Sequence, residues 1–544
     1  MEYSHFAGDP EGAHQLPAMV GRDGLMRKIN DQLAQQTSRP HILFLTGNGG
    51  IGKTRVLLEV LGLAQTKFND ILSPDYVVDL YHIQTHTPDG LAEAVWNALP
   101  PTASGRFSRY EAQKSAYARH QSSGDSRGLA EQHEAVLNAF WQDLAVVAGE
   151  RKLLLMLDTA EKAVYTTRRR AEEAVDIAES WEWLARSLSI IPNALVIVAG
   201  RPQCLDLNGE LEKRGIPYEV VEIPPLSEAE SLAYWDEVIS HTQNAGNEQL
   251  VERLNALDAR MRRSAHFYSD GLPIVLSLLI DYLSMAQQGD IPAELRVDPA
   301  QVQERVGREP KTVREELEKR FVERFIHNAR LGDTIDALGR APKGVDANLL
   351  SRLLNVGLAE AERRLEEVRK FSFVKQRPTD KRFFLHDVMY EILKRHLYDK
   401  PTDASAGARA SAIINQYYSD ALDRAKEQLD EVMQPVWEGQ RADLDFHRIS
   451  QATIERQTVL AEIVYYRLRQ DPGRGFLRYY RYMREAILSG QVLLDLLLQT
   501  ELLTFWNEED PTWEREEVGG IPRHVLEGLL SLRPVTRAWA EGDY

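Results

Sequence analysis

The sequence predicts a multidomain α/β protein in which a parallel five-stranded sheet is followed by a helical domain, a winged-helix domain and an all-helical arm. Short apolar and β-branched runs alternate with helical patterns in the first third of the chain, which is typical of a doubly wound sheet. From Ser227 onward helical periodicity replaces these runs, and strand-like runs return only near residues 371–385. At 544 residues the chain is also too long for one ordinary core.

Five runs are expected to form the parallel sheet, because each is rich in residues that favour strands and is bounded by turn or helix signals. They are residues 41–46, 76–83, 152–157, 194–199 and 218–223. Residues 100–133 are rich in Pro, Ser, Gly, Arg and Gln, and we interpret them as a surface excursion outside the core.

Changes of composition along the chain predict the domain boundaries. The expected segments are an N-terminal tail (1–18), the sheet domain (19–224), a helical domain (225–312), a winged-helix domain (313–400) and a helical arm or linker (401–544). The helical domain should begin at residues 226–228, where Leu-Ser-Glu is typical of a helix N-terminus.

Composition and charge restrict the class of protein. The formal charge of −17, from 65 basic and 82 acidic residues, disfavours general binding to nucleic acid. The single cysteine, Cys204, cannot form an internal disulfide and fits a small buried side chain in a reducing compartment. The N-terminus lacks a secretory pattern, and the longest apolar stretch, residues 272–285, is interrupted by Asp281 and is too short to span a membrane. We therefore expect a cytoplasmic protein without a membrane partner.

A glycine-rich segment after the first apolar run carries the strongest signal. It reads Gly47-Asn48-Gly49-Gly50-Ile51-Gly52-Lys53-Thr54 and satisfies the GxxxxGK[ST] pattern of a phosphate-binding loop, or P-loop. The glycines allow backbone amides to surround phosphate oxygens, and the helix that follows adds the positive end of its dipole. Lys53 is expected to contact the β- and γ-phosphates and Thr54 the Mg²⁺ ion, so ATP or ADP with Mg²⁺ are the expected cofactors. The alternative is a glycine-rich turn without a ligand.

An acidic residue stands where a triphosphate site needs one. Asp158 ends the apolar run 153–157 and is the Walker B candidate that would hold Mg²⁺ with Thr54. Three positions later, Glu161 could polarise the attacking water, although it could equally be an exposed carboxylate in the first turn of a helix. Thr159 occupies the place where many fast ATPases carry an acid, so we expect slow hydrolysis.

These motifs, together with three others, resemble the STAND class of AAA+-related nucleotidases, which includes NB-ARC proteins, NACHT proteins and bacterial maltose-regulon-type activators. The resemblance covers about residues 19–400. The segment Met19-Val20-Gly21-Arg22-Asp23 is similar to the family segment that lies against adenine, which implies that Val20 lines the base. The segment Gly271-Leu272-Pro273 is similar to a motif whose proline packs over adenine, although a proline is also structurally favoured in a first helical turn.

Two further segments extend the resemblance toward the phosphates. Ala199-Gly200-Arg201 is similar to the sensor segment of the family, in which the arginine reads the nucleotide phosphates. A guanidinium fits this role because its fixed fork binds a pair of phosphate oxygens, although Arg201 could also be a solvated residue at a strand end. Phe384-Leu385-His386-Asp387 resembles the MHD motif of the winged-helix domain, which implies that His386 contacts the β-phosphate of ADP. We interpret Asp387 as the N-cap of the helix that follows.

The predicted site therefore has catalytic, nucleotide-binding and metal-binding members. The catalytic candidates are Lys53, Asp158, Glu161 and Arg201. The nucleotide-binding candidates are Val20, Gly21, Arg22, Gly47, Asn48, Gly49, Gly50, Ile51, Gly52, Lys53, Thr54, Arg55, Pro273 and His386. The metal ligands are Thr54 and Asp158.

The resemblance implies a signal-transduction switch that rests closed with ADP and opens and forms homo-oligomers after exchange for ATP. Its further partners would be an activating ligand or protein and an effector, neither of which the sequence identifies. The alternative is an AAA+ initiator- or transcription-type ATPase whose winged helix binds DNA. DNA is disfavoured because residues 358–371 carry four glutamates against four basic residues and form no basic recognition face.

Aromatic and arginine residues interleave over residues 465–484. This mixture can bind nucleic acid or protein, but its helical spacing favours packing between two antiparallel helices.

Overall fold

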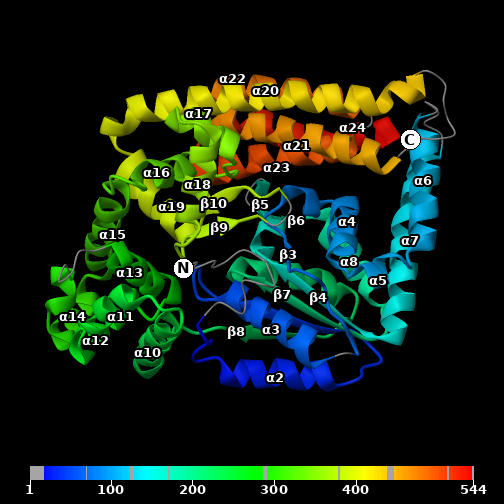
Figure 1. The fold of residues 1–544 in the computed structure, drawn as a ribbon. Helices are drawn as coiled ribbons and strands as arrows, with labels where there is room; N and C mark the ends of the chain where they lie inside the picture. Colours follow the sequence, from blue (N-terminus) through cyan, green and yellow to red (C-terminus); the bar gives the residue numbers. More distant parts are fainter. Residues whose placement is uncertain are drawn as a thin grey trace.

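The computed structural model describes residues 17–68, 70–122, 128–169, 172–285, 291–377, 380–437, 446–489, 491–510 and 514–541. It shows a mixed α/β protein with mostly helical content, in which a parallel sheet lies beside a larger helical body (Figure 1). Nearly all of the predicted N-terminal tail lies outside the described residues.

The sheet has six strands, all parallel to their neighbours. Its order is β2 (Ile71–Leu72), β4 (Lys152–Asp158), β7 (Ala194–Gly200), β1 (His41–Thr46) and β8 (Tyr218–Glu222), and β3 (Val78–Asp79) pairs with the carboxyl end of β4. β1 lies between β7 and β8, so the loop that follows it leaves the sheet at an interior position.

Helices cover both faces of the sheet, and alternate residues of each central strand pack against opposite layers. One layer contains α2 (Asp23–Ala34) and α3 (Lys53–Lys67). The other contains α4 (Pro88–Ala98), α7 (Leu129–Glu150), α8 (Glu179–Leu188) and α9 (Asn208–Lys213). This double cover explains why β1, β4 and β7 are nearly continuous apolar runs, since strands buried on both faces need no polar alternation.

Four of the five predicted strands are present, and the second is much shorter than predicted. The expected strand at 76–83 is reduced to Val78–Asp79, because the chain turns at Asp79 and continues as the 3₁₀ helix η1 (Ile83–His86). β2 was not predicted, and neither was the antiparallel hairpin of β5 (Val164–Arg169) and β6 (Glu172–Ile177).

The interpretation of residues 100–133 as an excursion outside the core was wrong in part, because residues 103, 107 and 110 belong to the core. The segment forms α5 (Pro101–Ser104) and α6 (Ser108–Ser122), and Phe107 and Tyr110 are buried against α7. Asp143 of α7 fixes this packing, because its carboxylate accepts hydrogen bonds from the backbone N–H groups of Arg109 (2.9 Å) and Tyr110 (3.0 Å).

A helical region follows the sheet. It contains α10 (Glu228–Asn244), α11 (Glu248–Asn255), α12 (Ala259–Ser269), α13 (Pro273–Met285), η4 (Ala293–Arg296), α14 (Pro299–Arg308) and α15 (Pro310–Ile326). The helix N-terminus expected at 226–228 is present as a capping box, in which the Ser227 hydroxyl accepts from the Glu230 N–H and the Glu230 carboxylate accepts from the Ser227 N–H.

The next segment has the element order expected of a winged helix. It contains α16 (Gly332–Arg340), α17 (Ala347–Leu354), α18 (Leu358–Val368), β9 (Val374–Gln376), β10 (Phe383–Leu385), α19 (Asp387–Leu393) and η5 (Lys394–Tyr398). β9 and β10 form an antiparallel hairpin, which we call the wing. Residues 332–398, from α16 to η5, are called the winged-helix region below.

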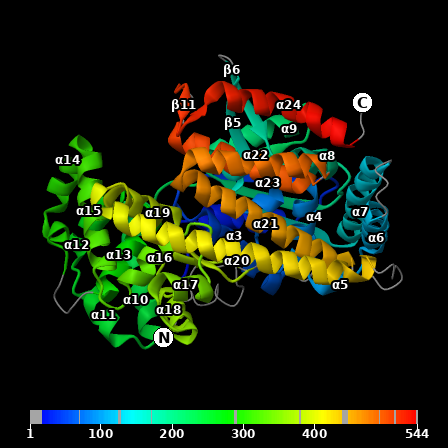
Figure 2. The same cartoon turned by 90° about the horizontal axis from the view of Figure 1, so that it is seen from above.

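The C-terminal arm consists of long helices. After η6 (Pro401–Asp403) come α20 (Ala404–Trp437), α21 (Phe446–Gln470), α22 (Pro472–Leu488), α23 (Val492–Glu509) and α24 (Arg523–Glu541). α20 and α21 lie side by side over the top of the molecule, as Figures 1 and 2 both show. The prediction of an all-helical arm missed the small hairpin of β11 (Glu517–Val518) and β12 (Ile521–Pro522), which turns through two glycines with positive φ. In the aromatic and arginine-rich segment, Tyr465, Tyr466 and Tyr479 are buried, as the packing interpretation requires, whereas Tyr480 is 46% exposed.

The arm is joined to the winged-helix region by ion pairs and by apolar packing. Lys343 pairs with Glu501 (2.5 Å), Arg382 pairs with Glu462 (3.0 Å), and Arg340 pairs with Asp403 (2.6 Å). One continuous apolar core runs from Leu226 to Leu530 through the helical region, the winged-helix region and the arm. Within the described residues, no helix is both long and apolar enough to cross a membrane.

Candidate functional site

The P-loop connects β1 to α3 and places its lysine across its own backbone. Gly47, Gly50 and Gly52 have positive φ, a conformation that lets successive amides turn inward and that other residues adopt only with strain. The Lys53 ammonium donates to the carbonyl oxygens of Gly47 (2.7 Å) and Asn48 (2.9 Å). Burial lowers the pKa of Lys53, because the ammonium group loses part of its hydration.

Two acids and one hydroxyl mark the metal side of this loop. The Thr54 hydroxyl donates to Asp158 Oδ2 at 2.6 Å, and Asp79 lies in register beside Asp158 on the neighbouring strand. Burial, and after it the charge of Asp79, raises the pKa of Asp158. A divalent cation would relieve this repulsion, so these oxygens suit Mg²⁺.

The described residues contain no group of three or more His, Cys, Asp or Glu side chains able to hold a metal ion. Thr54 and Asp158 are the residues that would hold Mg²⁺ here, together with phosphate oxygens and water, which is how Mg²⁺ is commonly held beside nucleotides.

Arg201 contacts acids from two parts of the chain. Its backbone N–H donates to Glu161 Oε2 (3.0 Å), its Nε lies 3.4 Å from Glu161 Oε1, and its Nη2 lies 2.9 Å from Asp387 Oδ2. The Glu161 side chain is only 12% exposed, so the interpretation of Glu161 as an exposed carboxylate does not hold. Arg201 thus links the end of β7 to the winged-helix region.

The interpretation of Asp387 as an N-cap was wrong. His386 is the N-cap of α19, and its Nδ1 accepts a hydrogen bond from the Val388 N–H at 3.2 Å. Burial, followed by the positive charge of Lys375, lowers the pKa of His386, so the ring is neutral and Nδ1 is available as an acceptor. Asp387 is the first residue of the helix, which leaves its carboxylate directed to Arg201.

The helical region forms a second wall and touches the P-loop directly. α13 begins at Pro273, and the next residue, Ile274, donates its N–H to the Gly50 carbonyl at 3.2 Å. A Cβ atom on Gly50 would lie 2.1 Å from Ile274 Cγ2, so only glycine allows this approach.

The segment before α2 also lines the cavity. Arg22 is buried and donates to the Pro224 carbonyl at 2.8 Å, which fixes the segment over the end of β8. Arg55 donates to the Pro17 carbonyl at 3.0 Å and pairs with Glu59.

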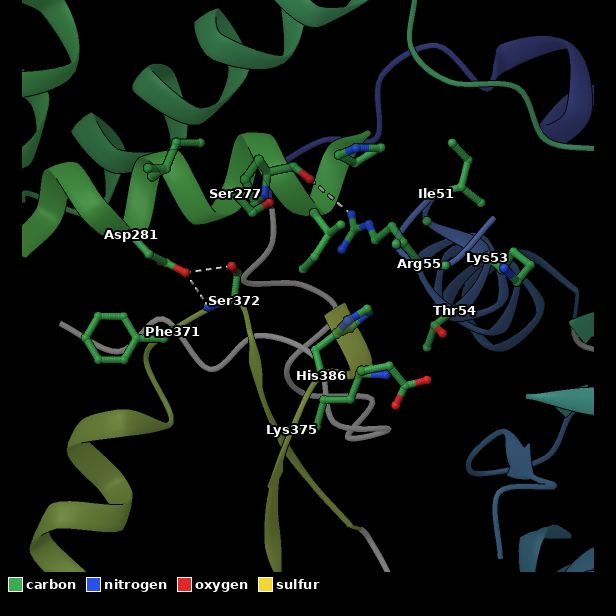
Figure 3. A pocket seen from close by; sticks show the side chains of 18 of the residues that line it. Ile51, Lys53, Thr54, Arg55, Ser277, Asp281, Phe371, Ser372, Lys375 and His386 are labelled. Atoms are coloured by element: carbon green, nitrogen blue, oxygen red, sulfur yellow. Dashed lines mark hydrogen bonds between the residues drawn. The ribbon is translucent and has the colours of Figure 1, made fainter. Parts of the chain in front are cut away.

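The wing closes the cavity from the opposite side. Figure 3 shows His386 and Lys375 on one side of the space and Lys53 and Thr54 on the other. Asp281 of α13 accepts hydrogen bonds from the N–H (2.9 Å) and hydroxyl (2.6 Å) of Ser372, which joins the helical region to the segment before the wing (Figure 3).

Most of the predicted site residues line one cavity of about 480 Å³. These are Val20, Arg22, Gly49, Gly50, Ile51, Gly52, Lys53, Thr54, Arg55, Asp158, Glu161, Arg201, Pro273 and His386. Gly21, Gly47 and Asn48 do not line it but shape the adjoining backbone. Other lining residues were missed because no local motif marks them: Asp79, Tyr81, Tyr234, Ser277, Asp281, Ser372, Lys375, Phe384 and Asp387 are among them.

The fold and this site together place a loop with the GxxxxGK[ST] pattern of a phosphate-binding loop opposite residues from two further regions of the same chain. No protein-family model matches the chain, and no curated protein matches it either.

Solved structures resemble the chain only distantly. The ORC2 protein of Aeropyrum pernix, solved in ADPNP and ADP complexes, has a TM-score of 0.31 at 13% identity, and the match covers 70% of this chain and 95% of that protein. The ORC1 protein of the same organism, in complex with DNA, has a TM-score of 0.27 at 15% identity and covers 70% and 94%. Cdc6p of Pyrobaculum aerophilum has a TM-score of 0.30 at 13% identity and covers 71% and 97%. Likeness of this size carries no argument about activity.

Proposed function

We propose that this chain is an ATP- and ADP-dependent conformational switch of the STAND class within the AAA+ ATPases. The observation that supports the proposal best is that the P-loop, α13 and the wing all line one cavity. A nucleotide in this cavity would contact three regions at once, so its phosphate number would alter the relative stability of their closed and open arrangements. The contacts of Ile274 with Gly50 and of Asp387 with Arg201 hold the closed arrangement.

In this proposal each charged residue has a separate task during ATP hydrolysis. Lys53 would stabilise charge on the β- and γ-phosphates, and Thr54 and Asp158 would hold a Mg²⁺ ion that neutralises part of the charge on the phosphates. Glu161 orients the attacking water, and Arg201 binds phosphate oxygens through its guanidinium.

The same arrangement favours slow turnover. Glu161 already accepts the N–H of Arg201 and faces its guanidinium, while that guanidinium is shared with Asp387. Both groups must therefore exchange partners before they act on a phosphate or a water molecule. We expect turnover well below the ~10 s⁻¹ of a typical enzyme.

His386→Ala tests the switch, because the P-loop would remain intact. A hydrogen bond from a protein group to a charged phosphate contributes about 1.5–3 kcal/mol, which corresponds to roughly 10- to 150-fold faster release of ADP. Release of a fluorescent ADP analogue and sedimentation with ATP should show faster exchange and more open or oligomeric protein.

The exposed His327, which does not line the cavity, provides the control as His327→Ala. Release and assembly that match the wild type in His386→Ala, with folding preserved, would make His386 a purely structural cap. ADP retained in the purified wild-type protein would further support a resting switch.

The second candidate is an AAA+ initiator- or transcription-type ATPase that binds DNA through its winged helix. One of the solved neighbours is a DNA complex, but a likeness of this size does not decide between the two candidates. The charges oppose it: Arg363 and Arg364 of α18 both pair with Glu360, each at 2.7 Å. On the wing, Arg382 is occupied by Glu462 of the arm.

Anisotropy of labelled duplex DNA, measured with ADP and with ATP at increasing salt, separates the two candidates. Binding with a steep salt dependence would favour the DNA-binding ATPase, because released counterions dominate such binding. We expect no such binding in the ADP state.

A further inference from the structure

Residues 79–86 connect the metal side of the cavity to the rest of the molecule. The segment begins where β3 ends beside β4, and the Leu80 N–H donates to the Asp158 carbonyl at 2.9 Å. Asp79 Oδ1 then accepts from the Tyr81 N–H at 2.9 Å. The backbone position of Tyr81 is therefore set by the two acids at the metal side.

The Tyr81 ring contacts the wing. It stacks on Phe384 of β10, with ring centroids 6.3 Å apart and ring planes 9° from parallel. The Lys162 ammonium, four residues after Asp158, lies 5.3 Å from the Tyr81 centroid, and the Arg377 guanidinium lies 5.8 Å from the Phe384 centroid. Each ring of this pair thus has a cation near its face, one from the sheet domain and one from the winged-helix region, and such a cation is attracted to the ring.

The far end of the segment contacts the arm. Gln84 forms a hydrogen bond with Thr458 of α21, and η1 packs against α23. Because the ion pairs of Lys343 and Arg382 attach the arm to the winged-helix region, residues 79–86 touch one packed body at two places.

We propose that Tyr81 is a positioning residue that couples the metal side of the nucleotide cavity to the position of the wing against the sheet domain. The stack of Tyr81 on Phe384 is a second latch, separate from the ion pair of Arg201 and Asp387 on the phosphate side. This inference rests on the proposed switch, since it requires a nucleotide held between the two regions.

The coupling works through repulsion between two carboxylates. Asp79 and Asp158 lie side by side, so their negative charges repel each other. A Mg²⁺ ion held by Thr54 and Asp158 would reduce this repulsion, and the separation of the two carboxylates would then depend on whether the ion is bound. Asp79 carries that change to the Tyr81 backbone, and the ring carries it to Phe384.

Release of a fluorescent ADP analogue from the full chain, measured in Mg²⁺ and in EDTA, tests the latch. Tyr81→Leu and Phe384→Leu should each accelerate release in Mg²⁺ by about 2- to 10-fold, the range expected for an aromatic pair. Release in EDTA should be unchanged, and the double variant should release no faster than either single variant because both remove the same contact. Tyr81→Phe keeps the stack and should behave as the wild type.

Phe476→Leu is the matched control, since Phe476 stacks on Tyr479 with centroids 5.9 Å apart but lies within α22, away from the cavity. Equal acceleration in Mg²⁺ and EDTA, multiplied effects in the double variant, or no effect in either single variant would overturn the proposal. Should Tyr81→Leu fail to fold, Phe384→Leu decides the question from the wing.

The latch and the switch fail in different ways. Faster release from His386→Ala with unchanged release from Tyr81→Leu and Phe384→Leu refutes the latch alone. Unchanged release from all three variants refutes the switch.

Discussion

Replacing Asp281 with asparagine should stabilise the protein at alkaline pH. Asp281 is 8% exposed, and its Oδ2 accepts both hydrogen bonds from Ser372. Burial raises the pKa of Asp281 from 3.8 to about 7, so the carboxylate is charged above neutral pH in a site that disfavours charge. An asparagine carbonyl can accept the same two hydrogen bonds without any charge.

The size and sign of the effect follow from proton linkage. At 1.36 kcal/mol per pH unit, a pKa raised from 3.8 to about 7 corresponds to a loss of up to about 4 kcal/mol of folding free energy. The folded protein keeps the proton up to about pH 7, whereas the unfolded chain loses it near pH 3.8. The stability of the wild type therefore falls between pH 4 and pH 7 and then levels off, and Asp281→Asn lacks this fall.

Thermal melting of both proteins between pH 5 and pH 8.5 measures the difference. The variant should melt several degrees higher at pH 8, with a smaller difference at pH 5, and its ADP release should be slower because the junction with Ser372 is more stable. Asp143→Asn is the matched control, since Asp143 is also buried and accepts two backbone hydrogen bonds. A variant that melts below the wild type at pH 8, or that keeps the full pH dependence, would refute the reasoning.

Three further substitutions test the nucleotide site itself. Lys53→Ala should abolish the rise in melting temperature on adding ADP, because ligand binding stabilises only through the folded site, and an unchanged rise would place the nucleotide elsewhere. Asp158→Ala should remove Mg²⁺-dependent ATP turnover in a phosphate-release assay, and turnover at the wild-type rate would exclude Asp158 as the metal ligand. Gly50→Ala should release ADP faster, since its Cβ would meet Ile274 at 2.1 Å and move α13 off the P-loop. Gly62→Ala, with no atom within 4 Å of its Cβ, is the control, and equal release from both variants would show that the α13 contact does not hold the nucleotide.

The parts of the site that could be predicted are those marked by a few neighbouring positions. The P-loop and the acid at the end of β4 depend on a strand, a turn and a helix that follow one another directly, so their spacing is visible in the sequence. Asp79 gave no such signal, because it lay inside a longer predicted strand that the structure ends at that residue. Tyr81 and Lys375 reach the cavity only through the packing of separate regions.

The errors have equally local causes. Both His386 and Asp387 have side chains that can cap a helix, and the N-cap is the residue whose backbone is not yet helical. That residue is His386, with φ −58° and ψ 139°. Residues 100–133 were assigned to the surface from their polar composition, but two aromatic residues, Phe107 just before α6 and Tyr110 in its first turn, are enough to bring this part of the segment into the core.

The length of α20 has a mechanical consequence. α20 has 34 residues, and the winged-helix region at its base is ion-paired to the arm. At 1.5 Å per residue this helix is a rod of about 50 Å. A rigid-body rotation of about 15°, of the size found in allosteric proteins, would carry the tip of such a rod through roughly 13 Å. In the proposed switch, a small rotation of the winged-helix region would therefore be amplified into a larger movement at the far end of the arm.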